Sequence, residues 1–585
     1  MAPAQPGLAG QLADQLRISP LLAQCLLNRG LTTAEVVGGF LEPRLRQLAD
    51  PFLLPDMAIA VDRLFRAREQ GEPLVVFGDY DVDGVTSTVL LLEVLRSLGW
   101  KAEHYLPHRV DEGYGLSREA VENCLKQSAV TLLLAVDCGS TTVDSIAWLG
   151  QRGVDVLVLD HHQVSSPPPA AVALVNPHAQ AALNGPASPP PGDATLPRPH
   201  VPAPRFTELC SAGLAFKLAH ALVKRGRETG LPGAADFDLR PLLDLVALGT
   251  IADLVPLVGE NRILVSAGLE RLDTTKRPGL AALKQVAQCP SPAGTYEVGF
   301  QLAPRLNAAG RLETAEEALH LLQAGSLAEA MPLAQALDRR NRERQQIERA
   351  ITEEAIGAVR GRFNPETDFV IVEGQELWHV GVVGIVASRL LQQFYRPTII
   401  VGGDGAGWRG SGRSIPGFDL AAALRECGDL LVHHGGHAMA AGLSIAPGNL
   451  DAFRTRLNDV ARRVLKPETL QPPLRLDAEV VLEDLTLDSL AQLAKLKPTG
   501  QGNPPIQFVA RKLQHHRAFQ RMGAEKQHVK MWVTNRGSTL EAVWWNAGAE
   551  SPPPGPFDLA FTPQINEYNG RRAVQLKVLD WITSQ

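Results

Sequence analysis

Acidic side chains alternate along one short segment of this sequence. Asp79, Asp81 and Asp83 stand two residues apart in Asp79-Tyr80-Asp81-Val82-Asp83-Gly84, so they would project to one side of an extended chain. Three carboxylates that close repel one another unless a cation lies between them. The alternative is a solvated acidic turn, because Asp-Gly is a common turn sequence. The residues that gather around the segment decide between these two interpretations.

Two further polar motifs follow apolar runs that are typical of buried strands. Residues 132–136 lead into Asp137, and residues 156–159 lead into Asp160-His161-His162. Residues 74–77 precede the alternating acids in the same way. Because α/β folds place their sites at the edge where the carboxyl ends of the strands meet, we expect the three motifs to converge there.

The residue types favour cations that prefer oxygen ligands. Carboxylates mixed with imidazole suit Mg²⁺ or Mn²⁺ better than a closed structural zinc site. Asp253 adds another acid at the end of the apolar stretch 249–253, and a carboxylate buried there needs a partner such as a metal ion. The sequence therefore predicts a metal site suited to phosphate chemistry.

The bulk composition is that of an ordinary globular protein. Hydrophobic residues make up 45% of the 585 and charged residues 21%, and the length predicts about three or four domains. The formal net charge of −6 means that any nucleic-acid binding must use local basic patches. Six scattered cysteines without a Cys-X-X-Cys pair argue against a disulfide framework or a zinc ribbon. Without a signal peptide or a long apolar run, we expect a cytoplasmic protein that binds no membrane.

Two α/β regions are separated by a polar helix in the pattern of the chain. Residues 51–335 alternate strand runs with helical patterns, which predicts a mainly parallel sheet. Within them, residues 165–204 are so rich in proline and alanine that we interpret them as a surface insertion that cannot order itself. Residues 336–360 carry charges around most of a helix, as a connector between domains would. Residues 361–466 predict a second α/β unit.

The two ends of the chain differ from these regions. Residues 1–50 predict short helices, and residues 467–585 predict a β-barrel or small sandwich. From residue 508 onward ten basic residues stand against six acidic ones, although the whole chain is acidic. Interleaved aromatic residues such as Trp532 and Trp545 offer stacking surfaces, so this part fits an oligonucleotide-binding barrel.

Taken together, the motifs resemble a known family. The segments 79–84, 136–140, 160–162 and 249–257 match, in order, the four motifs of the DHH phosphoesterases. From about residue 15 to the C-terminus the chain is similar to the RecJ branch, on the segments Pro107-His108-Arg109, 112–116, 302–311, 378–389 and 435–442. The resemblance implies a DHH domain and a DHH-associated domain, both α/β, joined by a long helix and followed by a C-terminal β-barrel of the OB type.

The resemblance also implies an activity and a set of metal ligands. RecJ proteins are 5′→3′ exonucleases that degrade single-stranded DNA to mononucleotides in DNA repair and recombination. Two divalent cations, Mn²⁺ or Mg²⁺, would be held by six residues, with their allocation to each ion left open: Asp79, Asp81, Asp83, Asp137, His161 and Asp253. Catalysis would depend on Asp137 as the bridge between the ions, on His162 beside the scissile phosphate, and on Asp160 as support for the histidines.

Three side chains near the acid motifs are candidates for DNA contacts. The guanidinium groups of Arg109 and Arg305 match phosphate geometry, and their alternative role is an interdomain salt bridge. Tyr114, between two glycines, would stack on a base or pack under a turn.

Other candidates for the DNA path come from the second half of the chain. Arg409, Ser411 and Arg413 lie in a glycine-serine segment that we interpret as a loop whose backbone N–H groups hold a 5′-terminal phosphate. Matches to the RecJ motifs add Asn307 and Arg311, and they place His437 across the cleft from the acids.

Two other functions stay open. A DHH phosphodiesterase for short oligonucleotides or cyclic dinucleotides would share the acid and histidine motifs but would usually lack the basic tail. A non-catalytic scaffold that binds single-stranded DNA in replication would have lost metal ligands, whereas all of them stand here.

The last expectations concern the assembly of the protein, its partners and the positions where it differs from the family. We expect a monomer in which the two α/β units and the connector form a ring that admits one strand but not a duplex. The resemblance adds a single-stranded-DNA-binding protein and a helicase as partners. The chain departs from the family in the long proline-rich insertion and in Ser211, where a glycine is usual, and we expect neither to touch a metal motif.

Overall fold

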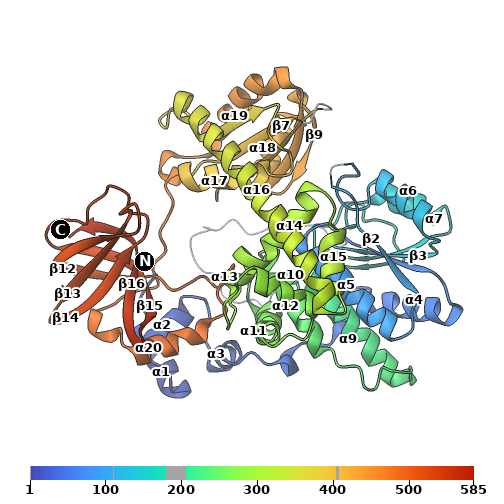
Figure 1. Cartoon of the computed structure of the whole chain (residues 1–585), viewed down its shortest axis with the longest axis horizontal. Helices are drawn as coiled ribbons and strands as arrows, with labels where there is room; N and C mark the ends of the chain where they lie inside the picture. Colours follow the sequence, from blue (N-terminus) through green and yellow to red (C-terminus); the bar gives the residue numbers. More distant parts are fainter. Residues whose placement is uncertain (1, 110, 180–205, 404–406, 585) are drawn as a thin grey trace.

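The chain folds into three bodies, of which two are joined by one long helix (Figure 1). The computed structural model describes residues 2–109, 111–179, 206–403 and 407–584. The first body contains the acid motifs, the second lies above it in the view, and a β-barrel forms the third at the left. No helix in the described parts of the chain is both long enough and apolar enough to cross a lipid bilayer.

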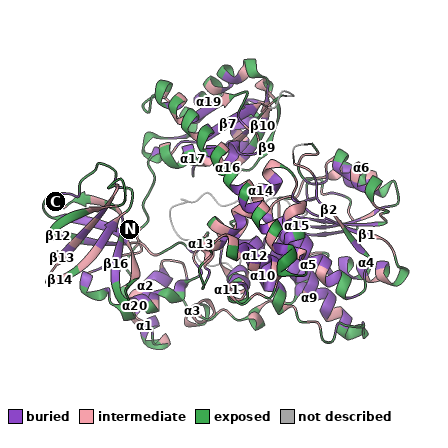
Figure 2. Cartoon of the chain, in the orientation of Figure 1, coloured by how far each residue is buried: buried purple, intermediate pink, exposed green. Residues whose placement is uncertain are grey.

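A five-stranded parallel sheet forms the centre of the first body, in the order β2-β1-β3-β4-β5. The parallel pairing confirms what the alternation of strands and helices predicts. Its inner strands are buried on both faces, which explains their unbroken apolar runs (Figure 2). The strands are β1 (Leu74–Phe77), β2 (Ala102–Tyr105), β3 (Leu132–Val136), β4 (Asp155–Leu159) and β5 (Ala173–Val175).

Helices cover both faces of this sheet and add a further helical layer. One face packs mainly on α4, α5 and α9, and the other on α6 and α7. The helices are α4 (Met57–Gln70), α5 (Val82–Ser97), α6 (Arg118–Gln127), α7 (Val143–Gly150), α9 (Ser211–Thr229), α10 (Leu243–Ala252), α11 (Gly259–Asp273), α12 (Pro278–Val286), α13 (Thr295–Glu297), the π-helical turn η4 (Val298–Leu302), α14 (Ala303–Leu312) and α15 (Glu316–Gln323).

Strand β5 corrects the interpretation of residues 165–204 as an insertion that cannot order itself. Its residues pair in parallel with β4, and Leu174 is only 8% exposed. The apolar run 172–175 supplies a strand that pairs at the edge of the sheet. The prolines on either side of this run dominate the composition of the segment, so composition alone does not reveal the strand. The remainder of the predicted insertion, from residue 180 onward, lies outside the described residues.

Helix α16 (Leu327–Arg362) joins the first body to the second and is longer at both ends than the predicted connector 336–360. Its first half buries Ala330 and Leu337 in the core of the first body, and its second half buries Ile351 and Val359 in a separate cluster with the second body. Each end of the helix therefore carries an apolar stripe for one body, while the stretch between them also buries polar side chains such as Asn341 and Glu348.

A mixed sheet forms the second body, in the order β6-β7-β8-β10-β9, with only the β6–β7 pair parallel. This arrangement agrees with the expected second α/β unit. The elements are β6 (Ile371–Gln375), α17 (Val383–Phe394), β7 (Thr398–Gly403), β8 (Trp408–Arg413), α18 (Leu420–Glu426), β9 (Leu431–Gly436), β10 (Ala440–Ile445) and α19 (Leu450–Val464).

The C-terminal strands close into a barrel because β12 pairs with both β13 and β15. Helices at the start of the chain pack into the same hydrophobic core, so the first and last parts of the sequence form one body. Sequence analysis had placed these parts in separate units. The elements are α1 (Pro6–Leu16), α2 (Pro20–Leu27), α3 (Ala34–Leu41), β11 (Ala478–Glu479), α20 (Leu487–Leu493), β12 (Phe508–Met522), β13 (His528–Asn535), β14 (Ser538–Trp544), β15 (Phe557–Tyr568) and β16 (Arg571–Thr583).

One buried guanidinium group anchors the barrel body to the first body. Arg262 of α11 is 2% exposed and donates hydrogen bonds to the backbone oxygens of residues 495–498, at 2.8 to 3.3 Å. It also donates to the carbonyl oxygen of Phe40 at 2.8 Å and lies 3.7 Å from the centre of that ring. The side chain thereby uses all its N–H donors on segments that are distant in sequence.

We expect Arg262→Met to loosen the attachment of the barrel body, because it leaves several buried carbonyl oxygens without a donor. Each such group costs about 1–3 kcal/mol, so the first thermal transition should shift down and proteolysis near residues 495–505 should accelerate. The exposed Arg271 lies on the same helix, and Arg271→Met should change neither measurement. Equal proteolysis of the two variants would contradict the anchoring role of Arg262.

Candidate active site

The acid motifs converge at the carboxyl edge of the parallel sheet. Asp79 follows β1, Asp137 follows β3 and Asp160 follows β4, while Asp253 ends α10 beside them. Asp137 adopts a left-handed backbone conformation with φ +64°, which turns the chain sharply at the strand end. The edge therefore gathers the residues that the sequence places on separate strands.

The alternating acids do not lie on an extended segment, contrary to the expectation from their spacing. Helix α5 begins at Val82, and Asp81 caps it by accepting hydrogen bonds from the backbone N–H groups of Asp83 and Gly84, at 2.9 and 3.1 Å. A β-carbon on Gly84 would lie 2.5 Å from the carbonyl oxygen of Asp79, so the tight turn needs glycine there. The strand-to-helix turn, rather than strand alternation, brings the three carboxylates together.

Two overlapping groups of ligand atoms lie close enough to share cations. His161 Nε2 is 3.5 Å from Asp137 Oδ1, 3.6 Å from Asp253 Oδ2 and 3.9 Å from Asp83 Oδ2. Ligand oxygens of Asp79, Asp81 and Asp137 all lie within 4.8 Å of one another. Asp137 takes part in both arrangements, as a residue placed between two ions must.

The donor atoms fit divalent cations. Asp79 Oδ1, His161 Nε2 and Asp253 Oδ2 are buried and have no hydrogen-bond partner among the described residues. Burial, together with the neighbouring acids, raises the pKa of Asp253 to about 9 and that of Asp83 to about 7. Burial and the adjacent carboxylates likewise raise the pKa of Asp137. Positive charge at this place would satisfy the unpartnered atoms and remove the repulsion.

The beginning of helix α9 supports two of these acids. The backbone N–H groups of Ser211 and Ala212 donate to the two carboxylate oxygens of Asp83, at 2.7 and 2.8 Å. The Ser211 hydroxyl donates to Asp137 Oδ1 at 3.0 Å. The expectation that Ser211 touches no metal motif is therefore wrong, because the fold brings this helix end against acids that are 74 and 128 residues away in the sequence.

Asp160 organises the two histidines rather than facing the other acids. It accepts hydrogen bonds from the backbone N–H groups of His161 and Ser140 and from His162 Nδ1, at 2.8, 3.0 and 2.8 Å. Asn176, which sequence analysis did not single out, donates to the Ser140 hydroxyl and to the His162 carbonyl oxygen, both at 2.8 Å. These contacts fix the turn from both sides.

The two histidines have different protonation preferences. Burial, together with the neighbouring His162, lowers the pKa of His161 to about 4, so His161 is neutral and free to act as a ligand. Burial alone would lower the pKa of His162, but its hydrogen bond to Asp160 and the negative charges of Asp160, Asp83 and Asp81 together raise the pKa above the usual value. His162 can therefore hold a proton near neutral pH.

Tyr114 lies directly over the metal-ligand cluster. Its hydroxyl donates to the Asp137 carbonyl oxygen at 2.9 Å, and its ring is half-exposed and roughly perpendicular to the rings of Tyr80 and His162. Arg109 lies with its guanidinium group 5.2 Å from the centre of the Tyr80 ring. Tyr114 is thus anchored through its hydroxyl at the mouth of the site, an arrangement that neither predicted role described.

Arginine side chains from both α/β bodies gather near the acids. Burial, together with the nearby cations Arg109, Arg344 and Arg413, lowers the pKa of Arg311 to about 10. Burial and Arg109 lower the pKa of Arg413 in the same direction. Arg109, Arg311 and Arg413 form no ion pair with a carboxylate in the described parts of the chain. The group is therefore ready to bind an anion such as phosphate.

The predicted anion loop is instead strand β8, in the interior of the second sheet. Its backbone groups pair with β7 and β10, so they are not free to hold a phosphate. Alternation along the strand places Arg409, Ser411 and Arg413 on one face, while Gly410 and Gly412 pack closely on apolar neighbours. An anion at this place would therefore meet side chains of β8 rather than its backbone N–H groups. Two of these side chains contact each other, since Arg413 Nη1 donates to Ser411 Oγ at 3.0 Å.

The remaining predicted residues have separate positions. Arg305 forms an ion pair with Asp338 at 2.9 Å, and because the first half of α16 packs in the first body, this pair lies within one body rather than between two. Asn307 accepts a hydrogen bond from the backbone N–H of Val82 at 3.2 Å and so helps to place the start of α5. His437 is exposed at the end of β9, near enough to His161 to act on its titration from the second body.

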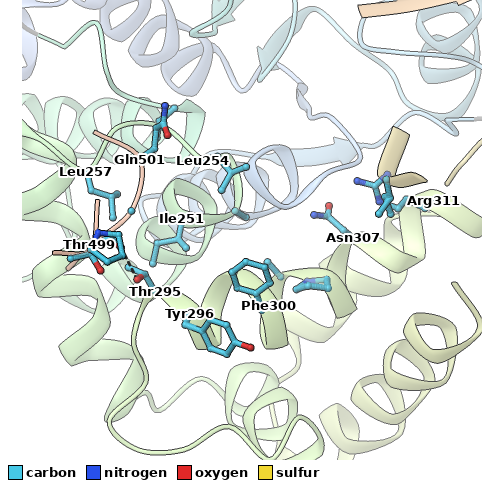
Figure 3. A pocket seen from close by; sticks show the side chains of 18 of the residues that line it. Ile251, Leu254, Leu257, Thr295, Tyr296, Phe300, Asn307, Arg311, Thr499 and Gln501 are labelled. Carbon is cyan, nitrogen blue, oxygen red and sulfur yellow. Dashed lines mark hydrogen bonds between the residues drawn. The ribbon is translucent and has the colours of Figure 1, made fainter. Parts of the chain in front are cut away.

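A pocket of about 480 Å³ adjoins the acids, and sequence analysis missed the residues that give it its character (Figure 3). Leu254, directly after Asp253, forms part of its wall together with Tyr296 and Phe300. Isolated aromatic residues in a helical region give no sequence signal that separates an exposed platform from a core position.

Comparisons with known proteins agree with this architecture. Family models match residues 73–250 as the DHH family N-terminal domain, 367–463 as the DHHA1 domain and 476–580 as the RecJ OB domain. The single-stranded-DNA-specific exonuclease RecJ of Bacillus subtilis (strain 168) is 39% identical over 98% of this chain and 69% of its own length. That of Dickeya dadantii (strain 3937) is 35% identical over 98% of this chain and 97% of its own length.

Solved structures of RecJ proteins also match this chain. The crystal structure of RecJ in complex with Mn²⁺ from Thermus thermophilus superposes with a TM-score of 0.82 at 30% identity, covering 100% of this chain and 79% of that one. A further crystal structure, of exonuclease RecJ bound to manganese, matches with a TM-score of 0.58 at 35% identity, covering 72% of this chain and 97% of that one. On this combination of domains, identity and coverage, the chain belongs to the RecJ family of DHH proteins.

Proposed function

We propose that this protein is a metal-dependent exonuclease that hydrolyses single-stranded DNA. The observation that carries the proposal is the convergence of the buried acids, the neutral His161 and unpaired arginines at one sheet edge. Relatives of the same domain composition are named as single-stranded-DNA-specific exonucleases, and solved relatives contain Mn²⁺ or Mg²⁺. In this proposal residues 51–335 carry the chemistry, and 361–466 and 467–585 guide the strand.

Different side chains have different roles in the proposed hydrolysis. Two divalent cations, when bound, lower the pKa of a water molecule and stabilise charge on the attacking and leaving oxygens. Asp79, Asp81, Asp83, Asp137, His161 and Asp253 would hold them, with Asp137 between the two. Asp160 holds the Nδ1 proton of His162, which leaves the other ring nitrogen to donate a hydrogen bond to the scissile phosphate.

A 5′→3′ direction and release of mononucleotides are the finer parts of the proposal. Arg109, Ser411 and Arg413 would hold a 5′-terminal phosphate, since they approach the acids from two bodies and the arginines lack carboxylate partners in the described residues. A channel between the two bodies and α16 would then admit a single strand. We propose a monomer that works with a single-stranded-DNA-binding protein and a helicase in DNA repair and recombination.

We expect Asp137→Ala to reduce digestion of single-stranded DNA roughly a thousandfold or more, because it removes the ligand placed between both ions. Strands labelled at the 5′ or the 3′ end, digested with and without Mn²⁺, measure both the loss and the direction. Release of labelled mononucleotide first from the 5′ end is the expected pattern.

The control for this experiment is Asp144→Asn, since Asp144 is an exposed acid in the first turn of α7. Unchanged turnover in Asp137→Ala would favour the scaffold alternative. Faster cleavage of dinucleotides than of long strands by the unaltered protein would favour the small-substrate alternative.

We also expect Mn²⁺ to stabilise the protein against heat. Free metal at about a hundred times its dissociation constant should add about 2.7 kcal/mol for one site. Asp137→Asn should gain less from Mn²⁺, yet should be more stable than the unaltered protein in EDTA, because its neutral amide relieves repulsion among buried acids. Thermal unfolding of both proteins in EDTA and in Mn²⁺ measures the effect, and an equal gain in both would argue against Asp137 as a ligand.

A further inference from the structure

We propose that His104, Glu316 and His320 form a second metal site, which binds Zn²⁺ and joins the edge of the parallel sheet to helix α15. The fold brings these side chains together from distant parts of the chain, since His104 and Glu316 are 212 residues apart in the sequence. The inference goes beyond the proposed function and does not depend on it, because the three residues are separate from the acid cluster.

The three side chains already have the spacing of metal ligands. Glu316 Oε2 is 3.0 Å from His104 Nε2 and 3.7 Å from His320 Nε2. One ligand atom from each of the three residues lies within 4.8 Å of the other two. Ligand atoms that surround one zinc ion at about 2.0–2.2 Å lie roughly 3–4 Å from one another. The side chains therefore need only small movements to close around an ion.

Two elements of the first body hold these ligands (Figure 1). His104 lies in the edge strand β2, opposite Val76 of β1 in the parallel pairing. Glu316 and His320 are four residues apart on α15, so they project from the same face of the helix. The side chains of His104 and Glu316 are partly buried, and that of His320 is 58% exposed. The ligands thus stand on regular elements, and water can reach the remaining coordination positions.

The charges around Glu316 leave it available for a cation. The adjacent acids Glu313 and Glu317 both form ion pairs with Arg340 of α16, at 2.6 and 2.7 Å. Within the described residues, the ion-pair partners of Glu316 are only the two histidines. When both imidazoles are neutral, the group carries one negative charge, which a divalent cation would compensate.

The ligand types favour a different metal from the one expected at the acids. The acid cluster offers mainly carboxylates, which suit Mn²⁺ or Mg²⁺. Two imidazoles and one carboxylate are instead the ligands of zinc sites that keep a position open for water. A set rich in nitrogen ligands also favours Zn²⁺ over Mg²⁺. The first body would therefore bind two kinds of metal ion at two places.

A bound ion would clamp two segments that lead to candidate phosphate ligands. Arg109 follows His104 by five residues, and Arg311 precedes Glu316 by five. Strand β2 pairs with β1 on one side only, so a metal bridge to α15 would restrain its free side. The ion would thus fix the positions of both segments without touching the acids. Only this consequence for the phosphate ligands relies on the proposed function.

Zinc content tests the site directly. The protein is dialysed against Zn²⁺ with Mn²⁺ in excess to occupy the acid cluster, and bound zinc is measured by elemental mass spectrometry. The unaltered protein should retain about one zinc ion per chain more than His104→Gln or His320→Ala. His320→Ala should fold normally because the side chain is largely exposed. His516→Ala removes an exposed histidine of the barrel and should retain as much zinc as the unaltered protein.

Equal zinc content in all four proteins would overturn the inference and would leave an ordinary hydrogen bond between His104 and Glu316. Neither this measurement nor the next one uses DNA. Failure of the proposed exonuclease function would therefore leave both results unaffected.

Hydrogen exchange tests where the ion binds and whether it acts as a clamp. In the presence of excess Mn²⁺, added Zn²⁺ should slow amide exchange in β2 and α15 of the unaltered protein by about tenfold or more. The same segments of His320→Ala should not respond to Zn²⁺, whereas those of His516→Ala should respond normally. A response confined to the acid motifs would place the zinc in the acid cluster and would overturn the inference.

Discussion

Repulsion among buried carboxylates is the constraint on which the rest of this structure depends. Asp79, Asp83 and Asp137 are each at most 3% exposed, and Asp83, Asp137 and Asp253 lie around the single imidazole of His161. In the absence of compensating charge, these acids favour their protonated forms, as the raised pKa values of Asp83 and Asp253 indicate. The site is therefore unfavourable for the fold alone and becomes favourable only when positive charge is bound.

The surrounding structure holds the acids in place despite this repulsion. The start of α9 donates two backbone N–H groups to Asp83, and the start of α5 is capped by Asp81. Helix starts carry partial positive charge, so both helix ends partly offset the repulsion among the carboxylates. Asp160 differs, because it is satisfied by backbone N–H groups and by His162 and keeps its charge without a cation. One cluster thus contains acids whose charge is left uncompensated and an acid that its neighbours fully satisfy.

The motifs at the sheet edge were predictable because local patterns encode them: each apolar run followed by an acid marks a strand end, and the parallel sheet brings those ends together. Contacts from distant segments were not, since Ser211 and Asn176 reach the acids only through the packing of the whole body. The Gly-Ser pattern around Ser411 is typical of a loop, yet a strand tolerates it because small residues let neighbours pack against one face. The exposure of Phe300 likewise depends on what the rest of the chain leaves uncovered. Local patterns therefore predicted which side chains converge at the sheet edge, and they did not predict the contacts and exposed surfaces that distant segments create.

The barrel body takes part in the site through its attachment rather than through its strands. Arg262 holds the carbonyl oxygens of residues 495–498, and the next residues form a wall of the aromatic pocket. The wall is tied down on its other side, since Thr295 Oγ1 donates to the Thr499 carbonyl oxygen and the Leu257 N–H donates to that of Gln501, both at 2.7 Å. A change in how the barrel docks must therefore alter the shape of the pocket while leaving the acids in place. The structure separates the chemistry, which one body contains, from access to it, which requires all three.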